Sequence, residues 1–267
     1  MKKYKFSDGA FEYSHSIDNK ISEKLSTRHC HDLYEILYVA NGRGRYLIEG
    51  ARFDLKPRTL LLIRPLAYHC VEVECESDYE RRVLHFDASM VSKDVRDILD
   101  KMAGAEDFES GSFFSPGSLS QDIISLFDKF DRADQLPESE RALYIKLVLS
   151  EMILLLSIAS KERIAHDNRD IAAQVAKYIN DYLEYKISLD SIAKRFFVSK
   201  YYLCRTFKKY SGVSIHSYIT NKRVIYAKKL IEAGETASGA AYKVGFGDYS
   251  AFYRAYVKIL GTPPTHK

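Results

Sequence analysis

Residues Ser188–Gly212 read SLDSIAKRFFVSKYYLCRTFKKYSG, and their apolar spacing predicts two short helices joined by a tight turn. We expect the first helix at Ser188–Arg195 and the second at Ser199–Tyr210. Ser199 can cap the second helix because its hydroxyl accepts a backbone N–H, and Gly212 suits the left-handed residue that ends it. Two helices joined in this way have the geometry of a helix-turn-helix unit.

The second helix has two distinct faces. At 100° per residue, Leu203, Phe207 and Tyr210 share one stripe, which we expect to be buried. On the other side, arginine could read guanine edges, lysine could contact phosphate, and tyrosine could pack on sugar or a thymine methyl group. The alternative is an ordinary solvated helix with scattered cations. The expected DNA contacts are Lys200, Tyr201, Cys204, Arg205, Lys208 and Lys209.

This pattern recurs 49 residues later, over Asp248–Gly261. Arg205 then aligns with Arg254, and Asp248 takes the place of the serine cap. The preceding helix aligns at a shift of 48, so the second turn is one residue longer. We therefore expect a second helix-turn-helix unit. Its expected DNA contacts are Tyr249, Ser250, Tyr253 and Arg254.

Two such units joined by one long helix, expected at Ser214–Ile231, resemble the AraC/XylS family of bacterial transcription regulators. The matching motifs are IAKRFFVSKYYLCRTFKKYSGVS at 192–214 and VGFGDYSAFYRAYVKILGTPP at 244–264. The resemblance implies binding to double-stranded promoter DNA, contact with RNA polymerase and control by a small-molecule effector. It also implies activation more often than repression.

Charge is distributed unevenly along the 267 residues. Residues 169–267 hold 17 Lys and Arg against 7 Asp and Glu, a net charge of +10, whereas the remainder holds 23 against 29, a net charge of −6. A basic half beside an acidic half predicts a polyanionic partner for one half only. We expect no membrane partner, because we find neither a lipidation signal nor an amphipathic helix left over once the core is built.

From Leu33 onward the pattern changes to short β-rich segments separated by turn residues, which is typical of a sandwich or small barrel. A loop is expected at Gly104–Gly117. The expected strands are Leu33–Val39, Arg45–Glu49, Thr59–Ile63, Cys70–Glu74 and Tyr79–Phe86, with a shorter extended piece at Phe11–Tyr13.

Within these strands, His29-Cys30-His31 is followed by Glu35 and, after six residues, by Gly42. This spacing resembles the first cupin motif, and His69 stands near the place of the second motif's histidine. The resemblance implies that His29, His31, Glu35 and His69 converge in a jelly-roll barrel. We expect them to bind a sugar or another small polar metabolite, with Tyr34, Tyr46 and Arg64 as weaker candidates.

The same four residues could instead hold a divalent metal by ligand type, or serve as hydrogen-bonded residues at the barrel mouth. We expect no metal, no cofactor and no enzymatic activity. The rival interpretation is a metal-dependent cupin enzyme with an appended helical domain, and a third is a protein-interaction module with basic helices.

Apolar residues at helical spacing predict helices at Val91–Met102, Leu119–Ala133 and Glu138–Ser160. The last has more apolar faces than one core needs, which favours either a homodimer or a wholly intramolecular core helix. The polar segment Lys161–Asp170 is expected to be an interdomain linker, followed by a helix at Ile171–Leu183.

The expected class is therefore α+β, in three parts. They are a cupin-like jelly-roll barrel over residues 1–90, a helical arm over 91–162, and an all-α DNA-binding domain with two helix-turn-helix units over 168–267. The four cysteines form no CxxC pair, which suits free thiols in a reducing compartment. The first residues lack an apolar segment, so we expect no signal peptide and a cytoplasmic protein.

Overall fold

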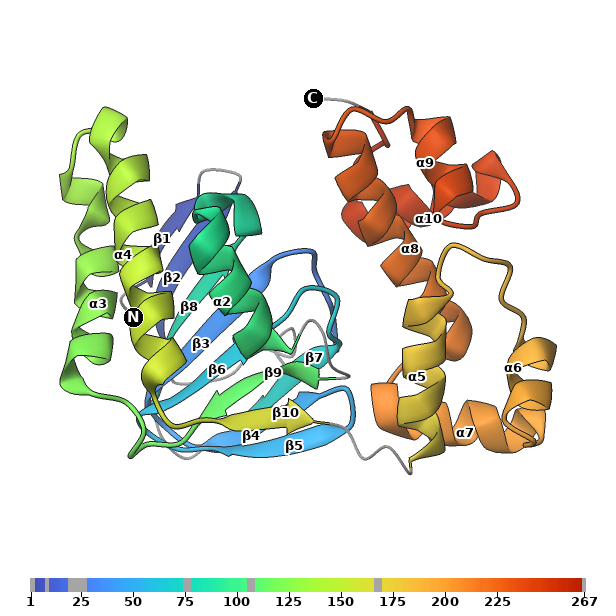
Figure 1. Cartoon of the computed structure of the whole chain (residues 1–267), viewed down its shortest axis with the longest axis horizontal. Helices are drawn as coiled ribbons and strands as arrows, with labels where there is room; N and C mark the ends of the chain where they lie inside the picture. The colour runs from blue at the N-terminus through green and yellow to red at the C-terminus, as the bar shows by residue number, and fades with distance from the viewer. Residues whose placement is uncertain are drawn as a thin grey trace. The chain divides into compact units, whose positions relative to one another are not determined.

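The computed structural model describes residues 3–7, 10–18, 28–73, 78–104, 109–165 and 170–265. Contacts between Cα atoms divide the chain into two compact units, shown in Figure 1. The first unit is Met1–His29 with Leu33–Ala165, and the second is His166–Lys267 with the short piece Cys30–Asp32.

The strands of the first unit form two antiparallel sheets. The larger sheet has the order β1-β2-β8-β3-β6-β9-β10, and the smaller sheet has the order β5-β4-β7. The strands are β1 (Lys3–Ser7), β2 (Phe11–Asp18), β3 (Tyr34–Asn41), β4 (Gly44–Ile48), β5 (Ala51–Leu55), β6 (Thr59–Ile63), β7 (His69–Val73), β8 (Tyr79–Phe86), β9 (Glu109–Phe114) and β10 (Glu162–Ala165).

Successive side chains of the larger sheet point to opposite faces, and each face has its own core. Ile36, Leu62 and Phe86 belong to a core shared with the helices α2 (Lys93–Ala103), α3 (Gln121–Asp131) and α4 (Glu138–Ile158). Leu37, Leu61 and Val83 point the other way and pack with residues of the smaller sheet. The larger sheet is therefore a middle layer between the helices and the smaller sheet (Figure 1).

The expected α+β class is confirmed, but the jelly-roll barrel is not closed. Within the described ranges, β1 and β10 form the two ends of one open sheet. Strand β2 covers eight residues and is longer than the expected piece at Phe11–Tyr13. Its second half, SHSID, lacks apolar alternation because the inward-facing Ser14 lines a polar cavity between the sheets.

The loop expected at Gly104–Gly117 is also wrong, because strand β9 lies within it. Ser and Gly disfavour a strand by propensity, but close packing here requires small residues. A Cβ added to Gly111 would lie 1.9 Å from the carbonyl oxygen of Leu62 on β6. Strand β10 pairs with β9 and occupies part of the expected linker at Lys161–Asp170.

The second unit consists of helices. After α5 (Ile171–Asp181), the unit contains α6 (Leu189–Arg195), α7 (Lys200–Ser211), α8 (Ile215–Glu232), α9 (Ala237–Lys243) and α10 (Tyr249–Leu260). Figure 1 shows the α6–α7 pair and the α9–α10 pair toward opposite ends of α8. Among the described residues, no helix is both long and apolar enough to cross a membrane.

Helices α7 and α10 begin and end in the same way, as the sequence repeat predicts. The Ser199 hydroxyl accepts a backbone N–H of the first turn of α7 at 3.2 Å, and the Asp248 carboxylate accepts the matching N–H of α10 at 2.7 Å. Gly212 and Gly261 end these helices with φ angles of 79° and 73°. The expected caps and helix ends are confirmed.

The two turns differ at one position that has a left-handed backbone in both. Gly245 occupies it in the second unit with φ 89°, and Phe197 occupies it in the first with φ 54°. Gly245 is required because an added Cβ would lie 2.8 Å from the carbonyl oxygen of Glu184. Phe197 is 95% exposed, so its side chain gains little contact in return for this backbone conformation.

We predict that Phe197→Gly raises the free energy of unfolding by about 0.5–1 kcal/mol, because glycine relieves the left-handed strain and loses almost no packing. Thermal or urea unfolding of the full chain measures the change. Phe197→Ala is the matched control, since alanine bears the same strain. An equal gain in both variants would contradict a backbone origin.

Candidate DNA-binding surface and ligand cavity

The second helix of each helix-turn-helix unit buries one stripe and exposes the other. Leu203 and Phe207 of α7 and Phe252 of α10 are fully buried. Phe207 also packs edge to face on Tyr218 of α8, with ring centroids 5.1 Å apart. This burial sets the rotation of both helices. All the expected DNA contacts are exposed, namely Lys200, Tyr201, Cys204, Arg205, Lys208 and Lys209 on α7, and Tyr249, Ser250, Tyr253 and Arg254 on α10.

These exposed faces combine tyrosine with cations. Lys200 pairs with Asp190 of α6, which partly neutralises it. Within the described part of the chain, neither Arg205 nor Arg254 forms an ion pair, so each guanidinium can meet a phosphate or a base edge. The aromatic side chain of Tyr201 is 76% exposed, so it is available to a partner and does not contribute to the core of this unit.

Two cations of α8 have structural roles instead. Lys222 is buried, and its ammonium group donates to Asn180 Oδ1 at 2.8 Å. Arg223 Nε donates to the carbonyl oxygen of Leu183 at 3.0 Å, and burial lowers the pKa of its guanidinium. These two cations therefore tie α8 to the segment around the end of α5.

A cavity of about 150 Å³ lies between the two sheets of the first unit. Its walls come from β2, β3, β4, β7 and β8, and His29 lies beside them. The apolar lining is Leu37, Val71 and Val83, and the polar lining is Ser14, His29, Glu35, Tyr46, Tyr79, Arg81 and His85. An apolar wall with several convergent polar groups is typical of a small-molecule site.

Glu35 is the buried carboxylate of this cavity and is surrounded by hydrogen-bonding groups. The Tyr46 hydroxyl donates to Oε1 at 2.8 Å, and Nε2 of His85 lies 3.0 Å from Oε2. Nε2 of His69 lies 3.3 Å from the same oxygen. Burial raises the pKa of Tyr46 well above its usual value, and the Glu35 charge adds to that rise. Tyr46 is therefore a permanent hydrogen-bond donor at neutral pH.

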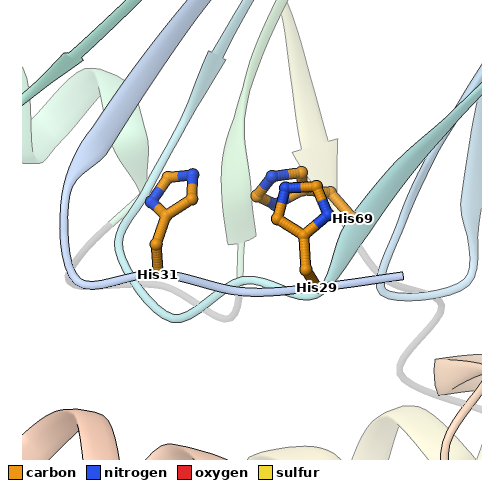
Figure 2. Close-up of side chains that lie close together, drawn as sticks. All are labelled: His29, His31 and His69. Carbon is orange, nitrogen blue, oxygen red and sulfur yellow. The ribbon is translucent and has the colours of Figure 1, made fainter. Parts of the chain in front are cut away.

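Figure 2 shows His29, His31 and His69 close together. Of these, His69 contacts the Glu35 carboxylate. Potential ligand atoms of His29, His31 and His69 lie within 4.8 Å of one another, and a second such group combines His31 with Glu35 and His85. Nδ1 of His69 lies 2.9 Å from the carbonyl oxygen of Ala67, which orients the ring so that Nε2 faces Glu35. By donor type these groups could hold a transition metal.

The structure thus brings together the four expected ligand-binding residues, although only His29 and Glu35 line the cavity. Tyr46 lines it as well, but the other two weaker candidates point elsewhere. The Tyr34 hydroxyl donates to Asp100 of α2, and the Arg64 guanidinium lies 3.7 Å from Glu49.

Sequence reasoning missed Ser14, Tyr79, Arg81 and His85. The available signal was strand alternation, because Tyr79, Arg81, Val83 and His85 lie on one face of β8. Burial raises the pKa of Tyr79 to about 12, and the nearby Arg81 charge offsets part of that rise.

Comparisons with known proteins match both the ligand-binding part and the DNA-binding part of the chain. An AraC-like ligand binding domain matches residues 17–145, and a helix-turn-helix domain matches residues 192–267. The chain belongs to the AraC family of transcription regulators. It is therefore a DNA-binding regulator with a ligand-binding N-terminal domain, and double-stranded DNA is its partner.

Two curated relatives of this AraC-family chain cover most of its length. One is the uncharacterized HTH-type transcriptional regulator YbfI of Bacillus subtilis, 25% identical over 83% of this chain and 79% of the relative. Another is the HTH-type transcriptional activator RhaS of Enterobacter sp., which is 23% identical over 93% of this chain and 90% of the relative. Among solved structures, ToxT of Vibrio cholerae covers 97% of this chain and 96% of its own, with 11% identity and a TM-score of 0.40.

Two buried tyrosines of the cavity should respond oppositely to loss of the hydroxyl. We predict that Tyr46→Phe lowers the free energy of unfolding by about 1–3 kcal/mol, because the buried Glu35 carboxylate loses a donor. Tyr79→Phe should raise the free energy of unfolding by about 1 kcal/mol, since its buried hydroxyl has no hydrogen-bond partner among the described residues and phenylalanine removes this uncompensated polar group. Urea unfolding at pH 7 compares the two variants, and an equal loss would contradict this assignment of partners.

Proposed function

We propose that this AraC-family protein is a transcription activator controlled by a small polar metabolite bound in the N-terminal cavity. The observation that supports it best is the pair of recognition helices, α7 and α10, with matched caps and outward faces of tyrosine and arginine. The name of the relative RhaS, a transcriptional activator, supports the sign of regulation.

The expected interaction with DNA uses both helix-turn-helix units. Helix α8 has 18 residues and spans about 27 Å at 1.5 Å per residue, which is of the order of one duplex turn. Each recognition helix would then enter one of two successive major grooves on one side of the DNA. The Arg205 and Arg254 side chains would read base edges, while Lys208 and Lys209 would contact phosphates.

Control by the metabolite requires that the ligand bind one conformation of the protein more tightly than another. Glu35, Tyr46, His29 and His85 offer donors and acceptors to hydroxyl groups of a ligand in the cavity. The ligand-bound conformation would then favour contact with RNA polymerase at the promoter.

Helix α4 supports a homodimer. It buries one face in the first unit's core, but Leu143, Leu147, Leu154 and Ile158 are 62%, 61%, 44% and 82% exposed. At 100° per residue these four side chains fall on one stripe. The same stripe on a second copy is its natural complement, because a twofold interface pairs identical surfaces.

We propose no catalytic role and a cytoplasmic location. The observation that favours the rival function, a metal-dependent cupin enzyme, is the convergence of His29, His31 and His69. Metal analysis of the purified protein after incubation with Zn²⁺ or Mn²⁺ and dialysis tests this rival. A stoichiometric metal together with turnover of a substrate would favour the enzyme.

The direct test of the regulator is binding of the full chain to DNA upstream of its own and neighbouring genes. Fluorescence anisotropy with unlabelled competitors should give binding at least a hundredfold tighter to one promoter than to random DNA of equal length. Equal binding to all sequences would contradict sequence-specific regulation.

We predict that Arg205→Ala and Arg254→Ala each weaken specific binding by about 1–3 kcal/mol and relax the base preference at one position of the site. Binding to a set of single-base operator variants measures this. Lys177→Ala is the matched control, because Lys177 is an exposed cation on α5 outside both recognition helices. If the variants lose equal affinity for specific and random DNA, the arginines contact phosphates and do not read bases.

We predict that Leu147→Lys converts the dimer to a monomer while leaving the unfolding of the single chain nearly unchanged, since this side chain is already exposed. Sedimentation equilibrium measures the association. Ala142→Lys places the same charge at an exposed position of α4 well away from the stripe and should retain the dimer. A Leu147→Lys variant that stays dimeric would exclude this surface.

A further inference from the structure

Two buried donors at the cavity wall lack acceptors. The Tyr79 side chain is fully buried, and its hydroxyl has no hydrogen-bond partner among the residues the structure describes. Nη1 of Arg81 is also buried and without a partner in that part of the chain. A buried polar group without a partner lowers stability, so two such groups together in one cavity require an explanation.

Both donors belong to the inward face of β8, together with Val83 and His85. Arg81 and His85 are four residues apart on that strand, so their Cα atoms are about 13 Å apart. His85 contacts Glu35, whereas Arg81 and Tyr79 lie toward the other end of the strand. The cavity therefore has a carboxylate–histidine end and an arginine–tyrosine end.

The charges at the two ends are balanced differently. At the first end, the Glu35 carboxylate already has the Tyr46 hydroxyl and the His85 ring as partners. At the other end, Nη2 of Arg81 lies 3.5 Å from the Asp18 carboxylate, and only Nη1 is left with the Tyr79 hydroxyl. The guanidinium carbon of Arg81 lies 5.5 Å from the centre of the Tyr79 ring, so the two side chains are neighbours. An N–H donor and an O–H donor, one of them cationic, match the two oxygens of a carboxylate.

We propose that the effector carries a carboxylate, which accepts hydrogen bonds from Arg81 Nη1 and the Tyr79 hydroxyl, while its polar body faces Glu35 and His85. The effector is thus a small organic acid with hydroxyl or ring substituents, not a neutral sugar. A cavity of about 150 Å³ has the size that accommodates a benzene-sized molecule. This inference rests on the proposed function, since it names the ligand class of the same cavity.

The experiment is calorimetric titration of the full chain with matched pairs of probes. Lactate is compared with lactamide and benzoate with benzamide, because each pair differs only in the anionic group, and glucose is added as a neutral polyol. We expect both carboxylates to bind at least tenfold more tightly than their amides. Tyr79→Phe should weaken carboxylate binding roughly tenfold and leave amide binding unchanged.

A second variant tests the charge. Arg81→Gln should abolish the preference for the carboxylate over the amide, while Arg45→Gln, an exposed cation on β4, should leave that preference intact. Circular dichroism checks that each variant is folded. If Arg81→Gln does not fold, the comparison of Tyr79→Phe with the unchanged protein tests the proposal by itself.

The outcomes separate this inference from the proposed function. Tighter binding of glucose or of the amides would overturn the acidic effector but retain a ligand cavity. If no probe binds even at concentrations of about 50 mM, the acidic effector is also overturned. The result of the DNA-binding experiment does not depend on this outcome.

Discussion

Burial of one stripe of each recognition helix is the constraint on which the functional surface depends. Leu203 and Phe207 in α7, and Phe252 and Tyr256 in α10, are at most 4% exposed. A helix that is fixed along one side cannot rotate, so the residues on its other side have a defined direction. The caps at Ser199 and Asp248 then fix where each helix begins. Base reading needs this precision because a contact to a base edge depends on both position and angle.

Burial of one side also orients the strands of the ligand-binding domain, where successive side chains alternate between the two faces of the sheet. Alternate residues of the larger sheet contact the helices on one face and the smaller sheet on the other. The inner face carries apolar residues such as Leu37 and Val83, which pack with the smaller sheet and also line the cavity, and polar residues such as Glu35 that line the cavity beside them. One strand, β8, therefore contributes both to the core that supports the domain and to the wall that would contact an effector.

Local patterns in the sequence were sufficient for the DNA-binding domain. Its caps, helix ends and apolar stripes are short-range features, and the repeat between Ser199–Gly212 and Asp248–Gly261 reinforced each of them. The five expected strands from Leu33 to Phe86 also lie where alternation and turn residues placed them, within one or two residues.

Features set by tertiary packing could not be predicted in this way. Strand β9 has the composition of a loop, and only the close approach of Gly111 to Leu62 explains why small residues are needed there. The cavity residues Tyr79 and Arg81 gave no motif, because their partnership depends on how two sheets face each other. The burial of Lys222 likewise depends on Asn180, which is 42 residues away in the sequence.

Recognition of DNA by this protein requires α7 and α10 to read two successive major grooves on one side of a duplex. Methylation interference on a bound promoter tests it most directly, because guanine N7 lies in the major groove. We expect two clusters of interfering guanines whose centres are about 10–10.5 base pairs apart. A single cluster, or two clusters half a turn out of phase, would contradict it.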